Sequence, residues 1–335
     1  MLLHVRIPQI LRVTALSALF VFVATMSSFA GNPSTLTWTK LNPTNGLPPR
    51  AAFASAYDPV SKKVVVFGGT DATSFLNETW TFDGTTWAQV ATSSGPTPRA
   101  GATMAYDSAT QKLVLFGGFV NLTILDDTWL WDGATSTWTP ARSAPGPRPA
   151  TNAMLFTDPV NGHVDMFGGY QGRFFSRSMW QWTGSNWMLL NPTTTPYPRS
   201  GAVVVEDPIR KNVVLFGGLS DIWVMDNTWT WDGTDWTQRH PSKQPVASLY
   251  FTRGGFDPVL NKVVVFSGGS QAVDQHTTWA WDGNNWNRLA PIASPKARER
   301  FGTVWDPTSR QFLIFGGLVF NTTTLFGDTW TLTRK

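Results

Sequence analysis

The segment 207–236, DPIRKNVVLFGGLSDIWVMDNTWTWDGTDW, decides the fold. It begins with an Asp-Pro pair, and its apolar run ends at Phe216-Gly217-Gly218. The motif Thr-Trp-Thr-Trp-Asp-Gly (228–233) follows, and then a further tryptophan, Trp236. Asp-Pro and Asp-Gly are turn signals, and a short apolar run closed by glycines is typical of a strand that is covered on both faces. The segment therefore predicts three consecutive strands of a small antiparallel sheet.

The same pattern recurs along the whole chain. Phe-Gly-Gly, or its variant at 266–269, occurs six times, with the phenylalanine at Phe67, Phe116, Phe167, Phe216, Phe266 and Phe315. Successive copies lie 49 to 51 residues apart, and an aspartate precedes each phenylalanine by nine residues. A fixed period of this length predicts a repeat architecture built from one supersecondary unit.

Each unit is predicted to have four strands, of which the first is innermost and the fourth carries a second tryptophan. That tryptophan series has only five members: Trp87, Trp138, Trp187, Trp236 and Trp286. Trp38 precedes Arg50 by 12 residues, as Trp87 precedes Arg99, so residues 35–41 should supply the missing outer strand of the last unit. Closing a ring with both ends of the chain removes a free sheet edge. We therefore expect an all-β, six-bladed propeller with four antiparallel strands per blade, with repeats at about 48–90, 97–141, 147–190, 197–239, 245–289 and 296–335.

Composition agrees with this fold and excludes several classes of function. The 335 residues include 18 Trp, 29 Gly and 23 Pro, a mixture that argues against long helices. Cysteine is absent, which excludes disulfides and thiolate chemistry. The formal net charge of +4 is small and dispersed, so we expect no nucleic-acid partner.

The first 30 residues have the pattern of an export signal. Arg6 and Arg12 make the start basic, an apolar run covers 13–25, and Ser28-Phe29-Ala30 offers small residues for cleavage. The run is shorter than the ~20 residues that span a bilayer comfortably. We expect cleavage after Ala30 and a secreted or periplasmic single domain at 31–335, without a membrane span and monomeric.

The Gly-Gly doublets and paired tryptophans over residues 35–335 resemble the kelch family of β-propellers. Galactose oxidase shares this type of fold, but its copper-radical site needs a Tyr crosslinked to Cys, so that cofactor cannot form here. The exported N-acetylneuraminate epimerases also resemble this chain, and the likeness implies acid–base residues and an arginine for a sugar carboxylate. Glu206, Glu299 and Arg253 are the weak candidates for those roles.

Arginines recur at the start of the repeats and are candidates for an anion site at the channel mouth: Arg50, Arg99, Arg148, Arg199, Arg253 and Arg298. Guanidinium groups suit carboxylates and phosphates. Arg148 is displaced by two positions, and Leu249 replaces the arginine of the fifth repeat. Because the position repeats, these arginines could equally be structural, bonding loop carbonyls or carboxylates within each repeat.

The third repeat departs most from the pattern. Its loop contains Tyr170, Arg173 and Arg177, which are candidates for ligand contact, and its buried strand carries Asp165, for which we expect a structural pairing with an arginine. In the fourth repeat, Glu206 takes a place that is aromatic in most others, and Trp223 adds an unrepeated aromatic side chain to a loop.

No catalytic motif or metal-ligand spacing is present, so we expect no metal and no cofactor. The favoured interpretation is an exported binding propeller that holds an anionic small molecule, an acidic sugar or a protein partner on its loop-rich face. The alternatives are an enzyme acting on an acidic sugar and a purely structural cell-surface protein.

Overall fold

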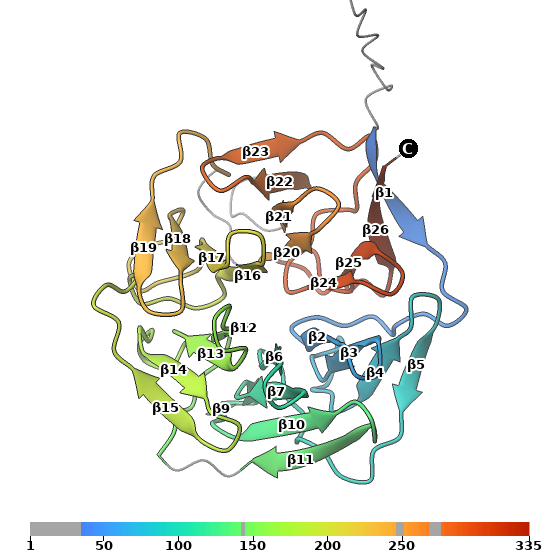
Figure 1. Ribbon diagram of the computed structural model, residues 1–335. Helices are drawn as coiled ribbons and strands as arrows, with labels where there is room; N and C mark the ends of the chain where they lie inside the picture. Colours follow the sequence, from blue (N-terminus) through green and yellow to red (C-terminus); the bar gives the residue numbers. More distant parts are fainter. Residues whose placement is uncertain (1–34, 142–144, 246–250, 268–275, 335) are drawn as a thin grey trace, which may run out of the picture. The chain divides into compact units, whose positions relative to one another are not determined.

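The computed structural model describes residues 35–141, 145–245, 251–267 and 276–334. These residues form six four-stranded antiparallel sheets, arranged as blades around a central channel (Figure 1). The predicted six-bladed, four-stranded propeller is confirmed. The predicted signal segment 1–30 and Leu249 lie outside the described residues.

Strands follow one another outward from the channel in every blade. The innermost strands are β2 (Ala54–Asp58), β6 (Thr103–Asp107), β12 (Met154–Thr157), β16 (Val203–Asp207), β20 (Arg253–Asp257) and β24 (Gly302–Asp306). The second strands are β3 (Lys63–Phe67), β7 (Lys112–Phe116), β13 (Val164–Phe167), β17 (Asn212–Phe216), β21 (Lys262–Ser267) and β25 (Gln311–Phe315). The third strands are β4 (Thr79–Phe82), β10 (Thr128–Asp132), β14 (Met179–Trp182), β18 (Thr228–Trp231), β22 (Thr277–Trp281) and β26 (Thr329–Arg334). The outer strands are β5 (Trp87–Val90), β11 (Thr137–Ala141), β15 (Trp187–Leu190), β19 (Trp236–Arg239), β23 (Trp286–Leu289) and β1 (Leu36–Leu41).

The last blade is built from both ends of the chain. β1 pairs antiparallel with β26, from Leu36 opposite Arg334 to Leu41 opposite Thr329. The predicted closure by residues 35–41 is therefore confirmed. A small hairpin of β8 (Phe119–Val120) and β9 (Thr123–Ile124), which the repeat pattern did not indicate, adds to the loop of the second blade.

The short turns between the first and second strands are held by the aspartate that ends each inner strand. Asp58 accepts the backbone N–H of Val60 at 3.0 Å, and Asp158 accepts that of Val160 at 2.9 Å. An aspartate carboxylate that bonds the backbone two residues on is a common way to fix a turn. These turns lie on one face of the propeller, and the long loops after the Gly-Gly doublets lie on the other.

Apolar side chains fill the spaces between neighbouring blades, where the structure shows six hydrophobic clusters. Each outer-strand tryptophan is nearly fully buried there. Trp187 also donates its indole N–H to Thr128, the first residue of the third strand in the preceding blade, at 2.9 Å. The same bond joins Trp87 to Thr329, Trp138 to Thr79, Trp286 to Thr228 and Trp38 to Thr278. The predicted packing of these tryptophans between blades is confirmed.

Candidate functional site

A circle of backbone hydrogen bonds surrounds the channel on the loop-rich face. One residue per blade contributes, and its N–H donates to the carbonyl oxygen of the equivalent residue in the preceding blade at 2.7 to 3.1 Å. The six residues, which we call the collar, are Ala52, Gly101, Asn152, Gly201, Phe251 and Arg300. All have φ between 51° and 65°, a left-handed conformation that is uncommon for residues other than glycine. The collar therefore holds the starts of the six inner strands together around the channel.

Four of the predicted channel arginines are buried, with at most 1% of their surface accessible: Arg50, Arg99, Arg199 and Arg298. Arg99 shows the shared arrangement. Its Nε donates to the carbonyl of Thr97 at 3.0 Å, and its Nη1 donates to that of Gly117 at 3.1 Å. Both Nη atoms donate to the carboxylate of Asp127, at 2.5 and 2.8 Å. The prediction that these four side chains line the channel mouth is wrong, because each one ties a Gly-Gly corner to the end of the following loop.

The carboxylate in this arrangement has a second donor. In the second blade, Trp129 donates its indole N–H to Asp127 at 2.8 Å. Burial alone would raise the pKa of Asp127, but the hydrogen bonds and charge of Arg99 hold it below its usual value. We call this unit the Arg–acceptor–Trp group; it is complete in three blades, as Arg50–Glu78–Trp80, Arg99–Asp127–Trp129 and Arg298–Asp328–Trp330.

The fourth blade has an incomplete group because its acceptor is an amide. Arg199 donates to the side-chain oxygen of Asn227 at 2.7 Å. An amide has one oxygen where a carboxylate has two. The Nη2 of Arg199 and the indole N–H of Trp229 are buried and have no partner among the described residues. Burial lowers the pKa of Arg199 to about 10.

The third blade lacks both the arginine and its acceptor. Ala150 occupies the arginine position, and Ser178 stands where the carboxylate would be. Trp180 keeps its place, but its indole N–H shows no hydrogen bond in the described part of the chain. A pocket of about 360 Å³ lies here, lined by Arg148, Gln171, Phe174, Phe175, Ser176, Arg177, Ser178 and Trp180. We call it the third-blade pocket.

Two of the arginines predicted for ligand contact, Arg148 and Arg177, meet at the third-blade pocket. Both are exposed, and neither forms an ion pair within the described ranges. Phe174, half exposed at 50%, stands beside them. Arg173 is exposed but does not line the pocket, and Tyr170 donates its hydroxyl to the carbonyl of Gly172 at 2.6 Å.

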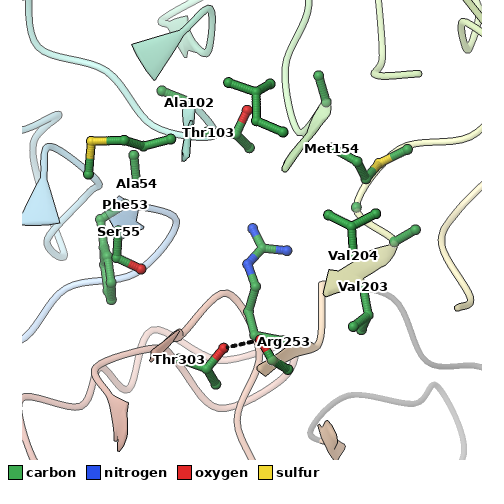
Figure 2. Close-up of a pocket in the computed structure, with 16 residues that line it drawn as sticks. Phe53, Ala54, Ser55, Ala102, Thr103, Met154, Val203, Val204, Arg253 and Thr303 are labelled. Atoms are coloured by element: carbon green, nitrogen blue, oxygen red, sulfur yellow. Dashed lines mark hydrogen bonds between the residues drawn. The ribbon is translucent and has the colours of Figure 1, made fainter. Parts of the chain in front are cut away.

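Arg253 is the predicted channel arginine that the structure places in the lumen. It lines a cavity of about 120 Å³ formed by the inner strands, and Figure 2 shows its side chain reaching from β20 toward the centre. Burial, and to a smaller extent the charge of Arg300, lowers the pKa of Arg253 to about 10. No carboxylate lines this cavity.

Glu206 and Glu299 do not join Arg253. Glu299 is buried, and its Oε1 lies 3.4 Å from Nε of Arg300. Glu206 lies next to the end of β16, on the side of the Asp-Pro turns, and lines a different cavity from Arg253. The acid–base pair that an acidic-sugar enzyme would place beside an arginine is therefore not assembled.

Asp165 is fully buried in β13 and is paired with a neutral amide rather than with the expected arginine. Gln181 donates to its Oδ1 at 2.8 Å, while its Oδ2 has no hydrogen-bond partner among the described residues. Burial, reinforced by the charge of Asp158, raises the pKa of Asp165 to about 8.

The described ranges show three further features. Trp223 is 64% exposed in the fourth-blade loop, near Ser220, whose Oγ accepts its backbone N–H. No group of three or more His, Asp or Glu side chains there could hold a metal ion. No helix in this part of the chain is long and apolar enough to cross a bilayer.

Comparison with known proteins agrees with the propeller fold. The family model of the KLHDC2/KLHL20/DRC7 Kelch-repeats domain matches residues 23–218. The chain belongs to the kelch-repeat family. A solved structure titled "Structure of YjhT" is similar with a TM-score of 0.68 and 16% sequence identity, over 87% of this chain and 99% of that one, which shows the shared fold. No curated protein matches the sequence. Kelch propellers commonly bind protein partners, and this kelch chain has the fold of such an interaction scaffold.

Proposed function

We propose that this protein is an exported binding propeller that holds an acidic partner on its loop-rich face, at the third-blade pocket. The observation that carries the proposal is the pair of exposed arginines, Arg148 and Arg177, which lie beside Trp180 and form no ion pair with any described residue. In three other blades an internal carboxylate occupies the place that Ser178 leaves open here.

The complete groups show which ligand chemistry this pocket suits. In the second blade one carboxylate accepts from both a guanidinium and an indole N–H. The third-blade pocket offers donors of the same kinds but has no carboxylate in its lining. A carboxylate from a partner would satisfy these donors, and charge-assisted bonds to arginine are among the stronger ones in proteins. Phe174 adds an aromatic anchor of the type common at interfaces.

A direct test measures the affinity of a fluorescent hexaglutamate peptide, with a hexaglutamine peptide of the same length as the neutral control. Binding of the acidic peptide should weaken about tenfold or more in Arg148→Ala/Arg177→Ala, the effect of losing ~1.4 kcal/mol. Arg173→Ala is the matched control, because Arg173 is exposed in the same loop but does not line the pocket. Equal losses in both variants would contradict a specific pocket.

A second variant fills the pocket from within. Ala150→Arg combined with Ser178→Asp should rebuild the Arg–acceptor–Trp group of the other blades. We expect this protein to keep its fold by circular dichroism and to lose binding of the acidic peptide. Undiminished binding would place the anion site elsewhere, with Arg253 as the next position to test.

Export rests on the basic and apolar pattern of residues 1–30. We expect the mature protein to begin at Gly31 and to be monomeric. Intact mass spectrometry of the protein from its native source, followed by native mass spectrometry, tests both. A mature chain that retains Met1 would contradict cleavage.

A further inference from the structure

The turn-side end of the channel holds a second cavity, of about 480 Å³. It lies between the ends of the inner strands and their turns, with Pro208 and Pro258 at its edge. It shares four lining residues with the cavity of Arg253, so the two occupy opposite ends of one channel: Leu155, Val204, Gly254 and Thr303. No part of the proposed carboxylate site lies at this end.

One residue per blade stands at the same level of this turn-side cavity, immediately before the aspartate that ends the inner strand or, in the third blade, directly follows it. Four of these residues are aromatic: Tyr57, Tyr106, Phe256 and Trp305. Each is partly buried, and each packs against a different inter-blade core. The rings are therefore held in place from behind while they line the cavity.

The two remaining positions are Thr157 and Glu206. Thr157 already donates its hydroxyl to the carbonyl of Tyr106 at 2.8 Å. Glu206 forms no hydrogen bond or ion pair within the described ranges, and it is the one charged side chain among the lining residues. A carboxylate surrounded by rings without a cation of its own is costly to desolvate, so the cavity favours an external positive charge.

Carboxylates of the turns act on two of the lining residues. After burial, which is the larger cause, the carboxylates of Asp58 and Asp306 raise the pKa of Tyr57. Burial and then the charge of Asp158 raise the pKa of Glu206. The side chains of Arg210 and His163 contact the carboxylates of Asp207 and Asp107, at 2.6 and 3.0 Å. Neither side chain lines the cavity.

The hydroxyl groups of three residues in the turn-side cavity, Tyr57, Thr157 and Thr303, are already used within the protein. Tyr57 shares a hydrogen bond with Thr308 at 2.8 Å, and Thr303 donates to the carbonyl of Gly254 at 2.8 Å. A quaternary ammonium has no N–H donors, so it requires only the rings and the negative charge of Glu206 from this lining. Quaternary ammonium groups bind to aromatic faces through cation–π attraction, and a nearby carboxylate strengthens it.

We propose that the turn-side cavity binds a small quaternary ammonium compound, with its cationic head among the four aromatic rings and beside Glu206. This site is independent of the acidic-partner site on the opposite face. The ligand class is defined by a permanent positive charge, alkyl substituents on nitrogen and the absence of N–H donors.

Isothermal titration calorimetry of the full chain with choline chloride tests the proposal by measuring the dissociation constant. The ligand control is the neutral carbon isostere of choline, dimethylbutanol, which has the same shape without the charge. We expect choline to bind at least about tenfold more tightly than the isostere. Equal affinity for the two compounds, or no binding of choline, would overturn the proposal.

Variants then assign the binding to this cavity. Glu206→Gln removes the charge at nearly constant volume, and we expect about tenfold weaker choline binding with little change in thermal stability. Trp305→Leu should weaken binding, while Trp305→Phe should restore most of it because a ring is retained. Unchanged choline binding in both Glu206→Gln and Trp305→Leu would overturn the assignment. Arg148→Ala/Arg177→Ala should leave choline binding intact, which separates this proposal from the acidic-partner site.

Discussion

A single oxygen atom distinguishes the fourth blade from the three blades that have a complete Arg–acceptor–Trp group. Asn227 offers one acceptor where Asp127 offers two, and two buried donors in that blade consequently lack partners: Nη2 of Arg199 and the indole N–H of Trp229. Leaving a buried donor unsatisfied carries a desolvation cost of about 1–3 kcal/mol. The defect is therefore local and can be repaired by one substitution.

Asn227→Asp should stabilise the protein by about 1–3 kcal/mol, because the second carboxylate oxygen accepts from both orphaned donors. The reciprocal change, Asp127→Asn, should destabilise the second blade by a similar amount. Urea unfolding of both variants at pH 7 gives the free energies of unfolding. A destabilised Asn227→Asp variant would show that burying the new charge outweighs its two hydrogen bonds.

Asp165 should make stability depend on pH. Its folded pKa of about 8 lies well above the usual pKa of an aspartate, so the folded state retains a proton that the unfolded state releases between these two values. The free energy of unfolding should fall as pH rises through this window, by at most about 1.4 kcal/mol per pH unit, and level off above the folded pKa. Asp165→Asn keeps an acceptor for Gln181 and cannot ionise, so urea unfolding at pH 5, 6.5 and 8 should show a flatter profile. An unchanged slope would assign the pH dependence to other groups.

At the scale of the strand, the outer tryptophans connect each blade to the one before it. Trp187 donates to Thr128, but Trp236 faces a third strand that begins with Met179, and its buried indole N–H has no partner in the described structure. The tryptophan–threonine hydrogen bond is therefore missing between the third and fourth blades, although the apolar packing of Trp236 remains.

This difference predicts unequal effects of the same substitution. Trp187→Phe loses an indole hydrogen bond and leaves Thr128 unpaired, whereas Trp236→Phe removes a donor that has no partner. We expect Trp187→Phe to destabilise the protein by about 1 kcal/mol more than Trp236→Phe. Chemical denaturation of the two variants under identical conditions compares them, and equal losses would mean that ring volume alone sets the contribution.

At the scale of the whole molecule, ring closure brings the first and last strands of the chain together in one sheet. β1 belongs to the sixth blade, and the chain then continues into β2 of the first (Figure 1). Every neighbouring pair of blades is consequently joined by one segment of the chain. Within the sixth blade, by contrast, no covalent turn joins β26 to β1. Antiparallel pairing of these two strands must replace the missing hairpin.

Trp38→Ala tests the strength of this closure. Trp38 is 1% exposed, packs against Phe266 and Phe312, and donates to Thr278 at 3.0 Å. We expect a loss of about 3–5 kcal/mol, as for other large aromatic truncations in a core. Thermal unfolding should show it, and a loss below that of the exposed Trp223→Ala would contradict closure through β1.

The repeats made the fold predictable, because a period of about 50 residues with fixed turn and tryptophan positions leaves little freedom in architecture. The same regularity made the arginines ambiguous. Their burial depends on acceptors such as Asp127, which stand 28 or 30 residues further along the chain, and the repeat pattern did not connect the two. Departures from the pattern were more informative. Ala150 and Ser178 could have indicated an open pocket, and the aromatic positions that correspond to Glu206 did indicate a distinct environment, although not its position on the turn side.

The collar makes each blade boundary separately observable by hydrogen exchange. Its six amide protons are each held by a carbonyl from the preceding blade, so a given proton becomes free to exchange when that particular boundary opens. The amides of Gly101 and Gly201, for example, monitor the boundaries between the first and second and between the third and fourth blades. If one blade boundary opens locally, its collar proton should exchange early while the other five remain protected. If the propeller unfolds cooperatively, all six collar protons should exchange at the same rate.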